Sequence, residues 1–191
     1  MLSWVLLAIL CAVPFIYAQT NLSVTDALFE SISGITTTGA TVLNNLDELP
    51  KGILLWRALL QWLGGIGIVV IALVILPFLR IGGMQLFHLE GDDPYDKFLP
   101  KISSVVTKII IVYSALTTLL FLLYYLNGMT LFDALAHSFT TISTGGFSTH
   151  NNSFAFFQSN VILNIAIIFM ILGKIEIIAV IYLIKRFIFK G

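Results

Sequence analysis

The stretches ITTTGAT at 35–41 and ISTGGFS at 142–148 decide the fold that this sequence predicts. They belong to a longer internal repeat, because residue n aligns without a gap with residue n+107 over 23–41 and 130–148. Identical pairs include Asp26/Asp133, Ser31/Ser138, Thr37/Thr144 and Gly39/Gly146. A repeat of this kind predicts two copies of one structural unit.

A short helix is expected before each Thr/Gly stretch, over 24–35 and 131–142. Ser23 and Thr130 each precede an acidic residue by three positions, a pattern that caps the start of a helix. About eleven helical residues give a length of roughly 16 Å, which is half the thickness of the hydrocarbon core of a bilayer. Irregular backbone at that depth is tolerated only where it is buried in protein or lines water. The repeat therefore predicts two re-entrant pore loops.

Composition also predicts a membrane protein. Hydrophobic residues make up 58% of the 191 residues and charged residues 10%, whereas a soluble domain carries roughly a quarter charged residues. The formal net charge is zero, which excludes the basic footprint of a nucleic-acid-binding protein. The single cysteine, Cys11, cannot form an internal disulfide and has no metal-ligand spacing around it.

Four apolar stretches approach the length of about 20 residues that a membrane-spanning helix needs. The first lacks the basic start of a signal peptide and carries Pro14 and Tyr17, so a retained helix is expected. We expect an all-α integral membrane fold of two K⁺-channel-like units, each with an outer helix, a pore helix, a filter loop and an inner helix. The predicted ranges are 1–80 for the first unit (helices 2–18, 24–35 and 53–79, filter 36–41), 81–104 for a connector, and 105–191 for the second unit (helices 105–126, 131–142 and 161–188, filter 143–148).

The basic residues predict the orientation in the membrane. Seven of the ten Lys and Arg residues lie in 80–108 and in the C-terminal cluster Lys185, Arg186 and Lys190. Because basic loops stay in the cytoplasm, the 80–104 loop and the C-terminus are expected inside, with 19–52 and 127–160 outside. The predicted location is the cell membrane, with several spans in contact with lipid.

The residue types of the two filter ranges are suited to a monovalent cation. Glycine permits the positive φ that turns carbonyl groups toward one axis, and threonine and serine add hydroxyl oxygens. Rings of such oxygens can replace the hydration shell of an alkali cation, and the negative C-terminal end of each short helix also favours a cation. Potassium is therefore the first candidate for the transported ion. Neither a covalently bound cofactor nor an enzymatic reaction is expected, and the only metal would be K⁺ in the filter.

Four motifs closely resemble the Trk/Ktr potassium-transporter subunits of the TrkH/KtrB type. They are DALFESISGITTTGATVL (26–43), WRALLQWLGGIGIVVIALVILP (56–77), GGMQLFHLEGDDPYDKFLPKI (82–102) and ISTGGFSTHNNS (142–153). The resemblance implies a homodimer and a cytoplasmic nucleotide-binding regulatory subunit. It places a K⁺ selectivity filter at Thr36, Thr37, Thr38, Gly39 and Ala40, and at Ser143, Thr144, Gly145, Gly146 and Phe147.

The number of units departs from the family pattern. The resemblance implies four pore units in a chain more than twice this length, whereas this sequence supplies two. The stretch LGKIE at 172–176 resembles the end of the fourth unit, so the chain reads as an abridged or internally deleted version. Two filter loops cannot close a four-sided ring, so conduction would need at least two chains. The alternative is a non-conducting remnant or assembly subunit.

Several single residues have two possible roles. Lys174 and Glu176 lie in an apolar stretch, where charge is costly, and could act at the pore or gate or at an interface. Glu30 could bind backbone behind the filter or tune the access of cations, and the 81–104 connector could contact the regulatory subunit or only link the units. Small residues let helices approach closely, so packing is favoured over gating for Gly64, Gly65 and Gly67.

Overall fold

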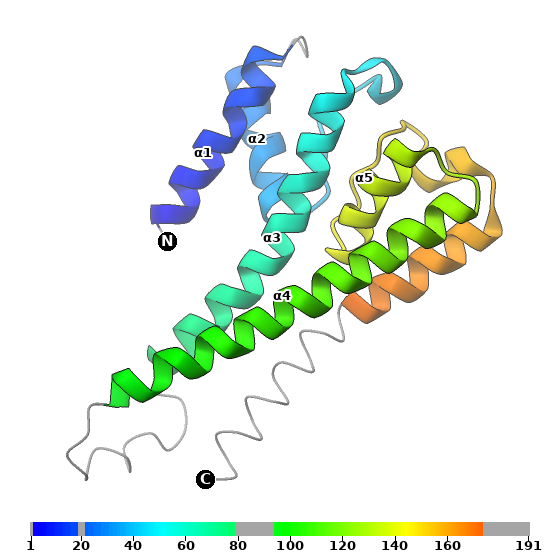
Figure 1. Ribbon diagram of the computed structural model, residues 1–191. Coiled ribbons are helices and arrows are strands. Elements are labelled where there is room, and N and C mark those ends of the chain that lie inside the picture. The colour runs from blue at the N-terminus through cyan, green and yellow to red at the C-terminus, as the bar shows by residue number, and fades with distance from the viewer. Residues whose placement is uncertain (1, 19–21, 79–93, 174–191) are drawn as a thin grey trace.

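The computed structural model describes residues 2–18, 22–78 and 94–173, with the backbone alone at 2–3, 69, 72–78 and 94–105. Every regular element in these ranges is a helix (Figure 1). The long helices are α1 (Leu2–Tyr17), α3 (Lys51–Phe78), α4 (Pro94–Leu126) and Asn160–Gly173; the short ones are α2 (Val24–Ile35), α5 (Leu131–Ile142) and the 3₁₀ turns η1 (Leu46–Glu48) and η3 (Ser153–Phe157).

The helices form two groups that α3 joins. In the first group α1 packs against α2, and in the second α4 packs against α5, while α3 contacts both short helices. Each group has a core of its own, around Phe15 and Leu60 in the first and around Leu120, Tyr124 and Ile162 in the second. Because α3 lies between α2 and α5, it determines how the two loops that follow these short helices meet.

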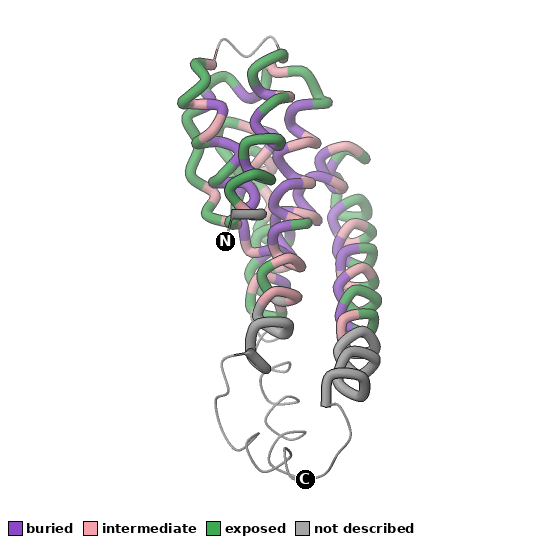
Figure 2. Tube along the Cα trace, turned by 90° about the vertical axis from the view of Figure 1, so that its left-hand side faces the viewer, coloured by how far each residue is buried: buried purple, intermediate pink, exposed green. Residues whose placement is uncertain are grey.

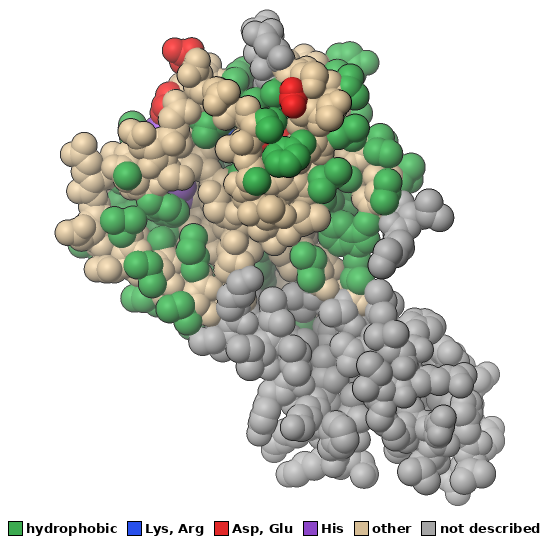
Figure 3. Space-filling view, turned by 180° about the vertical axis from the view of Figure 1, so that it is seen from behind, with side chains coloured by type: hydrophobic (Ala, Val, Ile, Leu, Met, Phe, Trp, Pro, Cys, Tyr) green, Lys and Arg blue, Asp and Glu red, His purple; other side chains and the backbone are tan. Residues whose placement is uncertain are grey.

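The outward faces of the long helices are apolar. Figure 2 shows exposed residues along the outer sides of the helices and buried ones where helices face each other. Leu6, Ile111 and Ile167 are each more than half exposed, and seen from behind the few visible acidic side chains lie at one end of the molecule (Figure 3). Within the described residues, Val106–Leu126 is long and apolar enough to cross a membrane, and Trp4–Tyr17 and Asn160–Gly173 are shorter apolar helices.

The observed helices can be compared with the predicted ranges. Helices α2 and α5 occupy the ranges expected from the repeat, α1 ends one residue before its predicted range, and α3 begins two residues before and ends one residue before its range. The exception is α4, which begins at Pro94 instead of 105, so 94–104 is helix and not an irregular connector. Proline is well tolerated at the first helical position, where its missing N–H would have no partner anyway. The predicted helix 161–188 is observed as Asn160–Gly173, and its remainder, 174–188 with Lys174 and Glu176, lies outside the described residues.

Candidate functional site

Each short helix is capped by the hydroxyl residue that the repeat predicted. Ser23 Oγ accepts a hydrogen bond from Asp26 N at 3.1 Å and donates one to Asp26 Oδ2 at 2.7 Å. Thr130 Oγ1 makes the same two contacts with Asp133, at 3.2 and 2.6 Å. The acid in the first turn also favours the positive end of the helix dipole. The two helices therefore start alike.

The two helices also end alike, in a Schellman motif. Thr38 N donates to Ser33 O at 2.9 Å and Thr37 N donates to Gly34 O at 3.0 Å. The second unit repeats both bonds 107 residues later, from Gly145 N to Thr140 O and from Thr144 N to Thr141 O, each at 2.9 Å. The left-handed residue that closes this motif is usually glycine, but here it is Thr37 (φ 55°) and Thr144 (φ 56°). A β-branched residue in this conformation is strained, and such strain often marks a functional position.

The residues after these turns form two segments, which we call the first Thr/Gly segment (36–41) and the second Thr/Gly segment (143–148). A second positive φ occurs at Gly39 (79°) and Gly146 (86°), again in register. The segments lie side by side, because a Cβ added to Gly39 would overlap the carbonyl oxygen of Gly145. A Cβ on Gly146 would meet no atom of the described residues within 4 Å. Glycine is thus required at 39 by both conformation and space, and at 146 by conformation.

Behind the first Thr/Gly segment lies a buried ion pair. Glu30 on α2 and Arg57 on α3 are 0% and 1% exposed, and Arg57 Nε donates to Glu30 Oε1 at 2.8 Å. Glu30 also accepts hydrogen bonds from the Thr41 hydroxyl at 2.8 Å and from Val42 N at 3.1 Å. Of the two roles expected for Glu30, these contacts are those of backbone binding behind the loop.

In the second unit His137 takes the place of Glu30. Its Nε2 lies 2.9 Å from Ser148 Oγ, and its Nδ1 lies 2.9 Å from Asp133 O. Ser148 is the repeat partner of Thr41, so in both units a buried side chain of the short helix binds the hydroxyl group at the end of the Thr/Gly segment. A hydrogen bond to this hydroxyl is therefore present in both units, although a carboxylate makes it in the first and an imidazole in the second.

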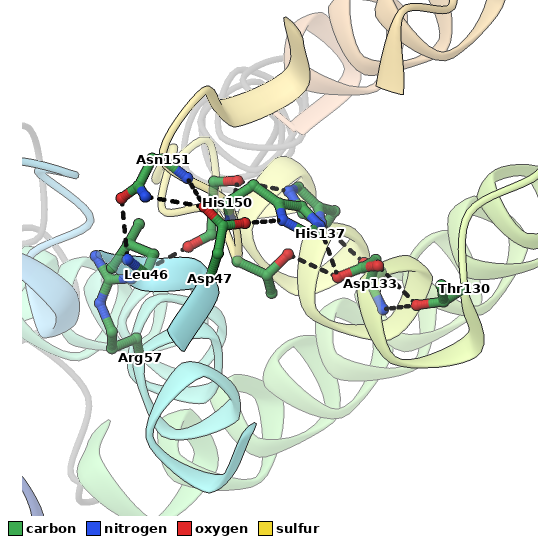
Figure 4. A network of polar contacts seen from close by, with 10 residues as sticks. Leu46, Asp47, Arg57, Thr130, Asp133, His137, His150 and Asn151 are labelled. Atoms are coloured by element: carbon green, nitrogen blue, oxygen red, sulfur yellow. Dashed lines mark hydrogen bonds and ion pairs between the residues drawn. The ribbon is translucent and has the colours of Figure 1, made fainter. Parts of the chain in front are cut away.

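The loops beyond the two segments are tied together at the molecular surface (Figure 4). His150 Nδ1 and Asn151 Nδ2 contact the two carboxylate oxygens of Asp47, at 2.5 and 2.8 Å, and Leu46 N donates to Asn151 Oδ1 at 2.9 Å. The hydrogen bond to His150 is the main cause that lowers the pKa of Asp47. These contacts join the 45–50 region of the first unit to the 148–151 region of the second.

Three of the four glycines of α3, Gly64, Gly65 and Gly67, differ in what surrounds them. A Cβ on Gly64 would overlap the Ile35 carbonyl oxygen at the end of α2, and one on Gly65 would come within 2.7 Å of Tyr113 Oη. A Cβ on Gly67 would make an ordinary contact of 3.4 Å with the Trp4 ring. In the second unit a Cβ on Gly173 would lie 2.5 Å from the carbonyl oxygen of Ile142, the repeat partner of Ile35. The surroundings of Gly64 and Gly65 are those of close helix packing.

Sequence reasoning placed the loop residues but missed Arg57 and Gln61. The ten predicted filter residues come together in the two adjacent segments, with Glu30 directly behind the first. Gln61 Oε1 accepts a hydrogen bond from Phe147 N at 3.1 Å, and Arg57 Nη1 donates to Ser148 O at 3.1 Å. The sequence did contain an indication of these two residues. They are a charged and an amide side chain in an otherwise apolar stretch, and their spacing of four residues puts both on one face of a helix. The described residues contain no cluster of His, Cys, Asp and Glu that could hold a metal ion.

Every regular element of the described residues is a helix, so the chain is an all-α protein, and the apolar side chains exposed on the outer faces of its helices are typical of the membrane-protein class. The chain belongs to the TrkH cation transport protein family, whose model matches residues 1–190.

Relatives with assigned names agree with this family. The chain is 41% identical to the Trk system potassium uptake protein TrkI of Halomonas elongata, over 93% of this chain and 36% of that protein. It is 47% identical to the Trk system potassium uptake protein TrkH of Vibrio parahaemolyticus, over 90% and 36%. The crystal structure of the potassium transporter TrkH from Vibrio parahaemolyticus matches with a TM-score of 0.75 at 46% identity, over 88% of this chain and 33% of that one. The chain thus spans about a third of the length of these relatives.

Proposed function

We propose that this chain takes part in potassium uptake across the cell membrane and that its two Thr/Gly segments line the ion path. The ligands would come from Thr36 to Ala40 and from Ser143 to Phe147. The observation that carries the proposal is the common backbone of the two segments, with positive φ at Thr37 and Gly39 and again at Thr144 and Gly146, in segments that touch at Gly39 and Gly145. Relatives that are named potassium uptake proteins support potassium as the ion.

The electrostatics of the site suit a cation. The C-terminal ends of α2 and α5 both point at the Thr/Gly segments, and the partial negative charge of a helix C-terminus attracts cations. The one pair of full charges behind the segments, Glu30 and Arg57, is mutually neutralised. Neutral oxygens with a weak negative field favour a monovalent cation, because it can leave such a site readily. Potassium is then the cargo, and the proposal requires no cofactor and no enzymatic step.

The proposed assembly follows from the number of segments. Two Thr/Gly segments line half of a four-sided path, so at least two chains would have to contribute to one pore, as a homodimer or larger assembly in lipid. We place the 80–104 region, of which 94–104 is the start of α4, and the C-terminus in the cytoplasm, where a nucleotide-binding regulatory subunit would bind. In this assembly Lys174 and Glu176 would lie at the pore, at a gate or at an interface between units.

Growth of a potassium-uptake-deficient host on limiting potassium tests the proposal. Expression of the chain should restore growth, and Gly39→Ser or Gly146→Ser should abolish the rescue while the protein remains in the membrane at wild-type amounts. Both substitutions force a side chain onto a positive φ, which costs of order 1–3 kcal/mol. Failure of the wild-type chain to rescue, at confirmed membrane abundance, would favour a non-conducting remnant or assembly subunit.

A further inference from the structure

Arg57 is buried between the two Thr/Gly segments and binds both. Its Nη2 donates to Thr41 Oγ1 at 3.0 Å, and its Nη1 donates to Ser148 O at 3.1 Å. Its guanidinium carbon also lies 4.2 Å from the centre of the Phe147 ring. Its Nε donates to Glu30 Oε1 at 2.8 Å. Arg57 is one of the residues of the polar network drawn in Figure 4. One side chain of α3 therefore connects the end of the first segment to the end of the second.

We propose that Arg57, together with Gln61, is a positioning residue that fixes the orientation of filter carbonyl groups and thereby sets the preference of the pathway for potassium over sodium. The proposal rests on the proposed function, since it assigns these residues a role at the same ion path. Neither side chain has to touch the ion. Both act through the peptide groups that they bind.

The geometry of the peptide bond gives the mechanism. In a trans peptide the N–H and C=O groups point in opposite directions. Gln61 Oε1 accepts from Phe147 N, so the carbonyl of Gly146 in the same peptide points away from Gln61. Glu30 Oε2 accepts from Val42 N in the same way, so the carbonyl of Thr41 points away from Glu30. The side chains behind the segments thus direct two carbonyl groups toward the opposite side.

Arg57 adds the connection between the two segments. It orients the Thr41 hydroxyl, which accepts from Arg57 and Leu43 N and donates to Glu30. It also holds the Ser148 carbonyl toward α3. The carbonyl contacts of Gly64 and Gly173 match the two helices with an offset of 109 residues, which places Ala166 at the position of Arg57. Because alanine has no side-chain donor, this pair of contacts has no counterpart at the matching position of the second unit.

A planar guanidinium is suited to this arrangement. Its donors point along fixed directions and can bind Glu30, Thr41 and Ser148 at the same time, whereas the single ammonium of lysine is a compact charge on a flexible stem. Arg57→Lys therefore keeps the positive charge beside Glu30 but loses the simultaneous contact with both segments. Gln61→Met keeps the size and removes the acceptor for Phe147 N.

The test combines hydrogen–deuterium exchange on the purified protein with cation uptake in cells. Arg57→Lys should speed exchange in peptides covering 41–43 and 147–149 by about tenfold, and lower the ratio of potassium to sodium uptake by about tenfold, the loss expected for one charge-assisted hydrogen bond. Gln61→Met should speed exchange at 147–149 alone and lower the same ratio. The control is Thr117→Val, which removes the buried bond from Trp62 Nε1 to Thr117 Oγ1 at 3.0 Å, between α3 and α4.

The outcomes separate the two proposals. If the wild-type chain transports no potassium, the proposed function fails, and the exchange data still decide whether Arg57 holds both segments. Arg57 does not position the filter if Arg57→Lys leaves exchange at 147–149 unchanged. The same conclusion follows if the ratio of potassium to sodium uptake stays at the wild-type value and total uptake falls only in proportion to the amount of protein. An equal change of ratio in Thr117→Val would overturn the proposal as well, because it would trace the effect to general loosening.

Discussion

Replacement of Gly64 by alanine tests how closely α3 must approach the first pore loop. The carbonyl oxygen of Ile35, the last residue of α2, occupies the space that a Cβ on Gly64 would need. That carbonyl cannot give way easily, because the Schellman motif fixes the end of α2 through Thr37 and Thr38. Gly64→Ala would therefore push α3 away from α2.

The magnitude follows from two opposing effects. Alanine is favoured over glycine in a helix interior by up to about 1 kcal/mol. Overpacking of a well-packed contact costs roughly 1–3 kcal/mol. Gly67→Ala is the matched control on the same helix, because its Cβ would lie in ordinary contact with the Trp4 ring at 3.4 Å. We expect Gly67→Ala to be neutral or slightly stabilising, and Gly64→Ala to be less stable than Gly67→Ala by about 2 kcal/mol.

Equilibrium unfolding in detergent, followed by circular dichroism, gives the free energies of unfolding of both variants and the wild type. Exchange protection at 36–41 shows whether the loosening reaches the first Thr/Gly segment. Equal stability of the two variants would refute the close approach of α3 to Ile35. Destabilisation by Gly64→Ala without any change at 36–41 would refute the argument that α3 supports this segment.

Three further predictions concern the loops. Gly39→Ala should destabilise the protein by about 1–3 kcal/mol and abolish growth rescue, because both its φ and the Gly145 carbonyl oppose a Cβ. Thr37→Gly should raise the free energy of unfolding by up to about 1 kcal/mol through relief of left-handed strain, yet lower potassium uptake if the hydroxyl is an ion ligand. The pKa of Asp47 is lowered in the folded state, so its stabilising contact is complete above the ordinary pKa of 3.8 and is lost as the pH falls through the folded value. The melting temperature should therefore fall with pH across this range in the wild type, and this pH dependence should be lost in Asp47→Asn.

The sequence predicted the short helices well because their determinants are local. The caps at Ser23 and Thr130 act within three residues, and the n+107 repeat placed both helices and both segments in register. The predicted start of α4 at residue 105 was wrong, because the helix already begins at Pro94, and a proline is compatible with the first helical position. Local patterns define where a helix can begin but not which of two permitted starts is used.

The geometry of the site was only partly predictable for a different reason. The sequence indicated positive φ at glycines, and Gly39 and Gly146 have it, but the first left-handed residue of each segment is a threonine. Nothing in the residue type of Thr37 or Thr144 indicates this conformation, because the surrounding helix end and loop impose it. The contacts of Arg57 join residues 27 and 91 positions away in the chain, and no local pattern encodes such a pairing.

The two units show which parts of the repeat are fixed and which can vary. Where the backbone must adopt a left-handed conformation, the residue is identical in both copies, as at Thr37/Thr144 and Gly39/Gly146. Where a side chain only has to bind the hydroxyl at the end of a segment, glutamate in one copy is replaced by histidine in the other. A glutamate needs a buried cation to neutralise it and a neutral histidine does not, which explains why Arg57 accompanies Glu30 while His137 is packed against the rings of Phe154 and Phe157. The residue pair 30 and 137 therefore explains why a buried cation accompanies the short helix of the first unit. Among the described residues, Arg57 is the cation that lies behind the loops and binds both segments.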